Sequence, residues 1–337
     1  MRIKALPALL IFVIVFVPLV ALAGVNESRV TTENAAVGVR GWFTRADAKW
    51  QISFPYITQI TNPGQQGKIE SELRFKNIDS PIVVVAGGGR IAPLFSFDVL
   101  LATGSISGGR GTDIDRFLSS SGGGLEYSRS QSDISGDVRM WGGNIYFNNA
   151  PHHARSRSRG WGAILGILHY EDNLTLRNGV QTNSALFEGG YMPLGPFPGL
   201  NSTFDFSWNM LRMGVLNRTH MTKRASFLTQ IAVYPYVDFR GEGYWNLRAG
   251  TGPDDFRVQS PNFIQKSTKG HGFDGSLELS YAIAENAELS AGYRYFYLRA
   301  EDGTDRVYFA DGSVSAATLD WVTVTRQGVY AEVVFKF

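Results

Sequence analysis

The sequence contains no cysteine, so neither disulfides nor thiolates can contribute to its stability or its chemistry. Only 18% of its 337 residues are charged, and the formal net charge of +2 gives no electrostatic basis for nucleic-acid binding. After the first 23 residues, no run reaches the ~18 consecutive apolar residues that a membrane-spanning helix needs. Histidine is scarce, with five residues, and none has zinc-site spacing. These absences exclude a disulfide-stapled domain and a helical membrane protein.

The first 23 residues have the organisation of a secretory signal peptide. Arg2 and Lys4 form a basic segment, an apolar core follows at 9–20, and Ala21-Leu22-Ala23 supplies the small residues that precede a cleavage site. We therefore expect residues 1–23 to be removed and residues 24–337 to be exported as one domain. An uncleaved anchor helix is the alternative, and the shortness of the apolar run disfavours it.

The dominant pattern after residue 35 is an alternation of apolar and polar residues, which is typical of β-strands with one apolar face. In the last such segment, Val329, Val333 and Phe335 share one face, while Tyr330 and Glu332 share the other. The alternation is clearest in four segments: KIESELRFK (68–76), YVDFRGEGYWNLR (236–248), HGFDGSLELSYAI (271–283) and GVYAEVVFKF (328–337).

A water-soluble β-sandwich would show the same alternation, but other features favour a transmembrane barrel. Opposite charges recur on the polar faces of successive segments, as expected for side chains that pair in a lumen, and Tyr and Trp lie near segment ends, as in interfacial girdles. The final aromatic residue, Phe337, resembles the assembly signal of bacterial outer-membrane barrels. A closed barrel also satisfies every backbone polar group within lipid. We predict an all-β, antiparallel transmembrane β-barrel in the outer membrane of a Gram-negative bacterium.

Ten strands are preferred and twelve are the alternative, because 217–235 reads either as a turn or as an extra strand. Short connections at 90–94 and 284–287 suit periplasmic turns. Residues 148–160 are long and basic for such a turn. Long polar segments suit external loops, which we expect near 46–67, 108–131, 178–202, 249–270 and 300–321.

Three consecutive segments between residues 68 and 147 carry a family resemblance: KIESELRFKNIDSPIVVVAGGGRI, FSFDVLLATGSI and GGRGTDIDRFLSSSGGG. Together they resemble the omptins, ten-stranded outer-membrane endopeptidases of Gram-negative bacteria. The resemblance implies that Asp113 and Asp115 are the Asp-x-Asp pair of the second external loop. In that family, a water is held between this pair and an Asp-His dyad, and the His takes a proton from the water as it attacks the scissile carbonyl.

This sequence departs from the omptin pattern at the dyad. In the fourth external loop, Asp254 stands at the dyad aspartate, but Phe256 stands where the family has His. Arg116 also replaces the aromatic residue that follows the Asp pair. His169 and His271 are the candidates for a substitute base, since His152 and His153 fall in the expected periplasmic turn.

Three functions remain open from the sequence. The replacement by Phe256 favours a non-proteolytic omptin-like barrel with a structural, adhesive or ligand-binding role at the cell surface. The second is an omptin-type endopeptidase that acts on an extracellular polypeptide with Asp113, Asp115 and Asp254 and a water nucleophile. The third is a small diffusion pore, which the filling of small barrels by their own side chains disfavours.

We expect no cofactor and no resident metal, although a carboxylate pair could bind Ca²⁺ or belong to a plain turn. The expected partners are outer-membrane lipid and, as the resemblance implies, lipopolysaccharide. No nucleic-acid partner is expected.

Overall fold

The computed structural model describes residues 35–60, 63–151, 160–187, 190, 193–248 and 258–337. The predicted signal peptide (1–23) lies outside these ranges, as do Asp254 and Phe256. No helix in this part of the chain is long and apolar enough to cross a membrane.

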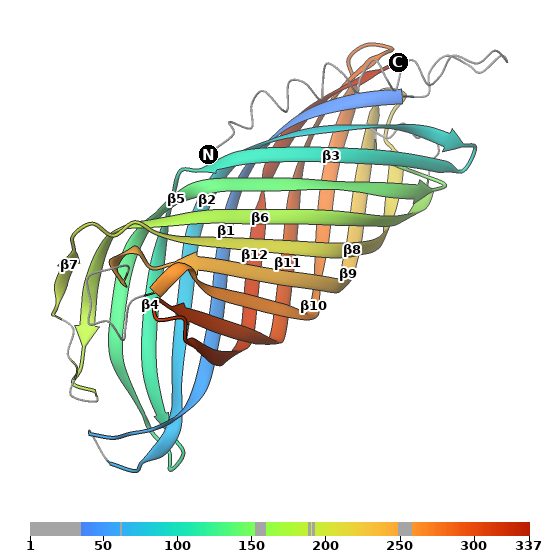
Figure 1. Cartoon of the computed structure of the whole chain (residues 1–337). Coiled ribbons are helices and arrows are strands. Elements are labelled where there is room, and N and C mark those ends of the chain that lie inside the picture. The colour runs from blue at the N-terminus through green and yellow to red at the C-terminus, as the bar shows by residue number, and fades with distance from the viewer. Residues whose placement is uncertain (1–34, 61–62, 152–159, 188–189, 191–192, 249–257) are drawn as a thin grey trace.

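The described strands form one antiparallel sheet that closes on itself (Figure 1). Closure is made by the first and last strands, which pair from Ala36 with Lys336 to Ser53 with Thr318. The elements are β1 (Ala35–Ile57), β2 (Gln66–Ala92), β3 (Phe95–Ile106), β4 (Gly108–Ser119), β5 (Gly124–Phe147), β6 (Gly160–Ser184), β7 (Gly195–Phe197), β8 (Ser202–His220), β9 (Ala225–Tyr244), the 3₁₀ turn η2 (Asn246–Arg248), β10 (Val258–Ala282), β11 (Ala287–Phe309) and β12 (Val314–Lys336).

The ring has ten strands among the described residues. β3 and β4 are two parts of one barrel strand, because each pairs with β2 on one side and β5 on the other. The short β7 pairs only with β6 and stands outside the ring. Residues 221–224 form a turn, and β9 then runs unbroken from Ala225 to Tyr244. The predicted barrel and its preferred ten strands are confirmed, and the twelve-strand alternative is wrong.

The positions of the periplasmic turns are confirmed, but the predicted external loops are wrong over most of their length. β4 and β5 run through 108–131 and leave only 120–123 between them, and β11 and β12 leave only 310–313. The physical reason is strand length: β8 has 19 residues and β2 has 27, whereas ~9–11 residues cross a bilayer. The barrel therefore continues well beyond the lipid, and in Figure 1 the β1–β2 and β4–β5 hairpins extend furthest from the termini.

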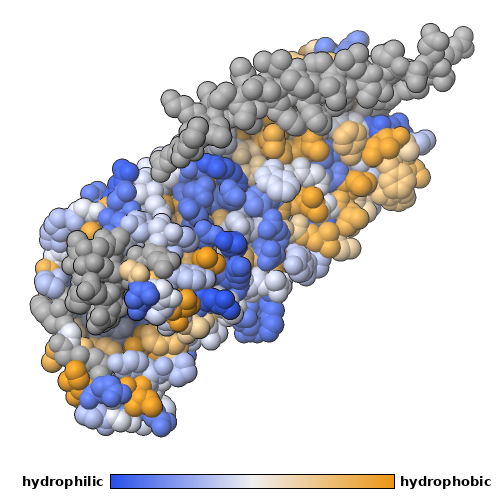
Figure 2. All heavy atoms as spheres, viewed as in Figure 1, coloured by the Kyte–Doolittle hydropathy of each residue, from blue (hydrophilic) through white to orange (hydrophobic). Residues whose placement is uncertain are grey.

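The outward face of the strands changes polarity along the barrel. On β9, Ile231 and Val233 point outward and are 58% and 51% exposed, while further along the strand the outward positions are Asp238, Arg240 and Glu242. Apolar residues accordingly gather on the half of the visible surface nearer the C terminus, and hydrophilic residues gather on the other half (Figure 2). The first half is the lipid-facing belt, and the second half stands in water.

This change corrects the prediction that the charges of KIESELRFK and YVDFRGEGYWNLR line a lumen. Above the belt the surrounding solvent is water, so these charges point outward, and Arg74 donates to Glu72 at 2.6 Å on the outer face. The apolar partners on the same strands point inward, where Phe75 and Phe239 are both 0% exposed. Both segments keep the alternation, but their faces are reversed relative to the lipid-embedded half.

β-Bulges readjust which residues point inward. Asn77, Asn178 and Asp302 adopt left-handed φ angles of 55°, 53° and 51°. The inward positions of β11 change at Asp302: before it, Leu298 and Ala300 point inward, and after it, Asp305 and Val307 do so. Because side chains alternate between the two faces of a strand, this irregularity is what turns Asp305 to the interior.

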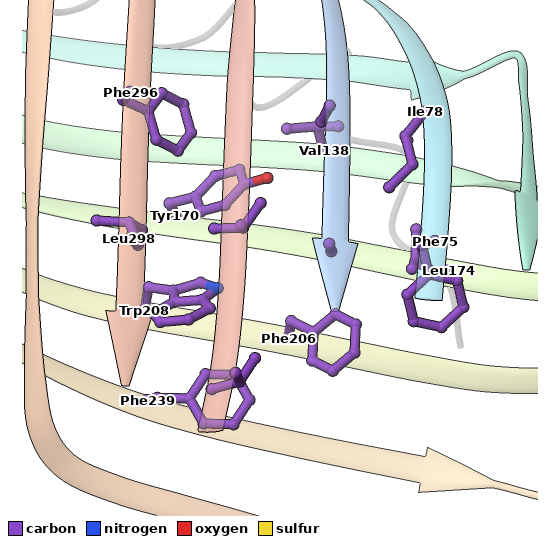
Figure 3. Close-up of a cluster of buried hydrophobic side chains, with 14 of the residues drawn as sticks. Phe75, Ile78, Val138, Tyr170, Leu174, Phe206, Trp208, Phe239, Phe296 and Leu298 are labelled. Atoms are coloured by element: carbon purple, nitrogen blue, oxygen red, sulfur yellow. The ribbon is translucent and has the colours of Figure 1, made fainter. Parts of the chain in front are cut away.

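Two kinds of layer fill the interior. Buried charges are paired in the lower layer: Asp274 accepts from Arg212 at 3.0 Å and from Arg294 at 2.8 Å at the level of the belt, and Arg326 donates to Asp172 at 2.7 Å just above it. Towards the extracellular end, aromatic rings meet both along and across the barrel (Figure 3): Trp208 and Phe239, on neighbouring strands, have centroids 4.6 Å apart, and Phe75 and Phe206, on facing strands, 5.8 Å. The barrel is therefore packed rather than hollow at these levels.

The pair formed by Arg326 and Asp172 gives a first prediction. Both side chains are almost fully buried, at 0% and 2% exposed, so Arg326→Met should destabilise the barrel by about 3–5 kcal/mol because it leaves an uncompensated charge. Adding Asp172→Leu should recover most of this loss. Urea unfolding in lipid vesicles, followed by heat-modifiable electrophoretic mobility, measures both variants. A double variant no more stable than Arg326→Met would contradict the pairing.

The lipid-facing belt gives a second prediction. Ile231 lies midway along the outward apolar positions of β9, so Ile231→Arg should cost about 2–4 kcal/mol of folding free energy in a bilayer. Thr318→Arg is the matched control, because Thr318 is exposed on β12 beyond the belt, and it should change stability little. Equal losses in the two variants would show that the belt is misplaced.

Candidate functional site

A cavity of about 920 Å³ opens at the end of the barrel away from the termini. Because the other end carries the short turns, the cavity lies at the extracellular mouth. Its walls come from the upper parts of β1, β2, β4, β5 and β10 to β12. The described residues that line it are Trp50, Ile52, Phe54, Ile69, Ser71, Asp113, Asp115, Tyr127, Ser128, Ala185, Phe187, Gly190, Trp245, Asn262, Phe263, Gln265, Asp305, Val307, Phe309 and Ser315.

Aromatic rings close the cavity from below. Trp50 and Phe263 belong both to the cavity wall and to the buried core, with their ring centroids 6.1 Å apart. Phe204 continues this packing at 5.4 Å from Phe263, and Phe75 lies 5.7 Å from Phe204. The cavity is thus a cup that ends on a packed core.

Asp113 and Asp115 lie on one wall of this cup. They are two residues apart on β4, so their side chains share a face, and both line the cavity. The cross-strand neighbours of Asp115 are Ser71 and Ser128, which line the cavity as well. The prediction that the pair sits in a loop is wrong, because β4 extends through it to Ser119.

Arg116 points away from the cavity. It donates to Glu72 at 3.1 Å on the outer face, where Arg74 also pairs with Glu72. Burial alone would raise the pKa of Glu72, but the hydrogen bonds from the two arginines outweigh burial and lower this pKa below its usual value. The residue that departs from the omptin pattern next to the Asp pair therefore serves the outer surface.

No histidine in the described part of the chain faces the Asp pair. His169 lies on the outer face of β6, stacked on Trp141 at 5.0 Å and hydrogen-bonded to Asn209 at 2.7 Å and to Glu171 at 2.9 Å. His271 is exposed and shares the outward face of β10 with Phe273. His220 ends β8 at the periplasmic side. His152, His153, Asp254 and Phe256 lie outside the described residues.

The cavity holds three further polar residues that the sequence did not indicate. Gln265 on β10 and Asp305 on β11 lie across the ring from the Asp pair. Trp50 on β1 lies two strands from Asp113, since Leu73 pairs with both. Gln265 and Asp305 are direct cross-strand partners. Both fall in segments whose polarity predicts external loops, near 249–270 and 300–321. Extending the period-2 pattern through 262–265 and 305–309 would have placed them on an inward face.

These three residues are deeply buried and carry unsatisfied polar atoms. Trp50, Gln265 and Asp305 are 2%, 0% and 1% exposed. Within the described structure, Trp50 Nε1, both amide atoms of Gln265 and Asp305 Oδ1 have no hydrogen-bond partner. Burial raises the pKa of Asp305 to about 6. Asp305 lies above the lipid-facing belt, since outward Arg299 and Glu301 on the same strand already form an ion pair at 2.8 Å.

Among the described residues, no group of three or more Asp, Glu or His side chains is arranged to hold a metal ion. The Asp pair alone supplies carboxylates from one wall only.

Ring closure, the apolar outer belt and the paired interior charges define a transmembrane β-barrel, and the chain belongs to the outer membrane of a Gram-negative bacterium. Its structure is similar to the outer membrane protease OmpT of Escherichia coli, with a TM-score of 0.65 and 13% identity, over 93% of this chain and 99% of that chain. At this identity the similarity shows the fold alone.

Weaker matches are also outer-membrane proteins. The translocator domain of the autotransporter NalP of Neisseria meningitidis has a TM-score of 0.30 and 11% identity, with 97% of each chain covered. The Ail protein of Yersinia pestis has a TM-score of 0.28 and 8% identity, over 90% of this chain and 99% of that chain. No protein-family profile and no curated protein sequence matches the chain.

The buried carboxyl of Asp305 gives a third prediction. Because its pKa is raised from 3.8 to about 6, the native state binds a proton more tightly than the unfolded chain, so this group's contribution to stability falls as pH rises between those values. The contribution should drop by about 3 kcal/mol from about pH 3 to about pH 8. Asp305→Asn should lack this component, so wild type minus variant should fall with pH in urea unfolding. A difference that stays flat would rule out the raised pKa.

Proposed function

We propose that the chain is an omptin-like outer-membrane barrel that binds a ligand in its mouth cavity and does not hydrolyse peptides. The observation that carries the proposal is the composition of the two cavity walls. Asp113 and Asp115 stand on one wall with no described histidine facing them, while the other wall presents unsatisfied polar atoms above an aromatic floor. Concave, mostly apolar sites with a few fixed polar groups are typical of ligand binding.

Peptide hydrolysis in the omptin manner needs a base within hydrogen-bond reach of the attacking water. His169 and His271 both point to the outer surface, and Phe256 stands in the sequence where the family has its base. The runner-up function, an endopeptidase that uses Asp113 and Asp115 and acts on an extracellular polypeptide, therefore lacks a proton acceptor of the family's kind among the described residues.

The diffusion-pore alternative has less support. The contacts from Trp50 through Phe263 and Phe204 to Phe75 fill the lumen below the cavity, and the pair of Arg326 with Asp172 fills the next level. A solute would have to displace both layers to cross.

Lipopolysaccharide is the lipid partner that we propose for the outer surface. Outward basic side chains stand above the belt, among them Arg45, Lys76 and Arg110. They are suitable for contact with anionic head groups.

Peptide cleavage tests the proposed function. Refolded protein in lipopolysaccharide-containing micelles should release no more product from a peptide library than protein-free micelles do, and Asp113→Ala/Asp115→Ala should not change this. The physical reason is the missing general base, since positioned proton transfer contributes about 10²–10⁴-fold to rate.

A matched comparison is Asp302→Asn, which neutralises a carboxylate on the outer surface, 68% exposed and 3.3 Å from Lys269, and keeps a residue that tolerates the left-handed φ of 51°. Robust cleavage by the wild type that survives in Asp302→Asn and disappears in Asp113→Ala/Asp115→Ala would overturn the proposal and establish the endopeptidase.

A further inference from the structure

The unsatisfied polar atoms of the cavity gather at one place. Gln265 and Asp305 are opposed across the β10–β11 ladder, and Trp50 contacts Phe263, two residues before Gln265, at 6.1 Å between ring centroids. The set offers two acceptors, Gln265 Oε1 and Asp305 Oδ1, and two donors, Trp50 Nε1 and Gln265 Nε2. A buried polar group without a partner costs free energy. A ligand that forms hydrogen bonds with these atoms therefore gains binding free energy.

Among the described residues that line the cavity, every charged side chain is acidic: Asp113, Asp115 and Asp305. The nearby basic residues Arg74 and Arg116 point outward, where they pair with Glu72. An anionic ligand would meet the buried carboxylate of Asp305, whereas a cation would be attracted by it.

The rest of the lining is largely aromatic. Seven rings contribute to it: Trp50, Phe54, Tyr127, Phe187, Trp245, Phe263 and Phe309. Tyr127 and Phe187 are stacked with centroids 4.5 Å apart, so part of the wall is already a flat ring surface. Aromatic faces attract desolvated organic cations, by about 2 kcal/mol or more in buried sites.

We propose that the mouth cavity binds a small organic ammonium ion with an apolar body, whose nitrogen is held by Asp305 and the Gln265 carbonyl while its body packs on the aromatic wall. This inference rests on the proposed function and specifies its ligand class. An ammonium N–H donates to Asp305 Oδ1 and to Gln265 Oε1, which satisfies both orphan acceptors. The apolar body excludes water from the ion pair and so strengthens it.

A strongly hydrated cation such as Na⁺ or Ca²⁺ fits less well. Such ions require several oxygen ligands around one point, and the described carboxylates form no cluster of that kind. A neutral aromatic molecule would satisfy the rings but would leave Asp305 unpaired. The selectivity expected of this cavity is therefore for charge and apolar surface together.

Calorimetric titration of the refolded protein in detergent micelles tests the ligand class. The probes are phenethylammonium chloride and its neutral analogue 2-phenylethanol, each also titrated into protein-free micelles to subtract partitioning. The ammonium should bind at least about tenfold more tightly than the alcohol, which corresponds to about 1.4 kcal/mol. Asp305→Asn should remove this preference and leave the alcohol unaffected.

Asp302→Asn is the control, because it makes the same chemical change on the same strand at an exposed position outside the cavity, and Asn tolerates its left-handed φ of 51°. It should bind as the wild type does. Heat-modifiable mobility establishes that each variant is folded.

Equal affinity for the two probes, retention of the ammonium preference in Asp305→Asn, its loss in Asp302→Asn, or no ammonium binding at all would each overturn the ligand class. None of these outcomes would restore peptide cleavage, so a failure of this inference is distinct from a failure of the proposed function.

Discussion

The structure depends on one constraint: each strand passes through two solvents while its backbone hydrogen bonds stay within a closed ring. In the lipid-facing half, outward side chains are apolar and inward charges are paired, as with Arg212 and Asp274. Beyond the lipid the order reverses, so Phe239 turns inward and Arg240 outward. Because closure removes both sheet edges, strands far longer than a bilayer needs remain satisfied, and a rigid, water-exposed cup stands on the membrane.

An alternation of apolar and polar residues is sufficient to predict strands, and the prediction succeeded for the features that depend on strands alone. It indicated the strands, the closed barrel and its location, and it brought Asp113 and Asp115 to the mouth. It could not report which face meets which solvent, because KIESELRFK alternates in the same way whether its charges point to a lumen or to bulk water. Nor could it report changes in which face points inward: the inward positions of β11 change from Leu298 and Ala300 to Asp305 across the left-handed residue Asp302. The polarity of strand segments above the lipid also resembles that of loops, so the pattern did not indicate the wall that contains Gln265.

The layers of the interior follow from the same change of solvent. Where lipid surrounds the ring, Arg212 and Arg294 pair with Asp274. An unpaired charge buried there would lose its hydration without compensation, which costs free energy. Where water surrounds the ring, the interior becomes a conventional apolar core whose rings meet at 4.6 to 5.8 Å. That core blocks the lumen, and its upper surface is the floor of the cavity. The same aromatic packing therefore prevents passage through the barrel and forms the base of the cavity.

The Asp pair acquires a different meaning in these surroundings. Two carboxylates on one wall are half of a hydrolytic arrangement only when a base stands opposite them. Here the described residues across the ring from the pair include Asp305 and Gln265, among aromatic rings. The ligand class proposed for this cavity follows from that combination of a carboxylate with ring faces. A fold shared with a protease can therefore hold a site whose chemistry is recognition of positive charge, and the side chain opposite the carboxylates, rather than the carboxylates themselves, decides between the two.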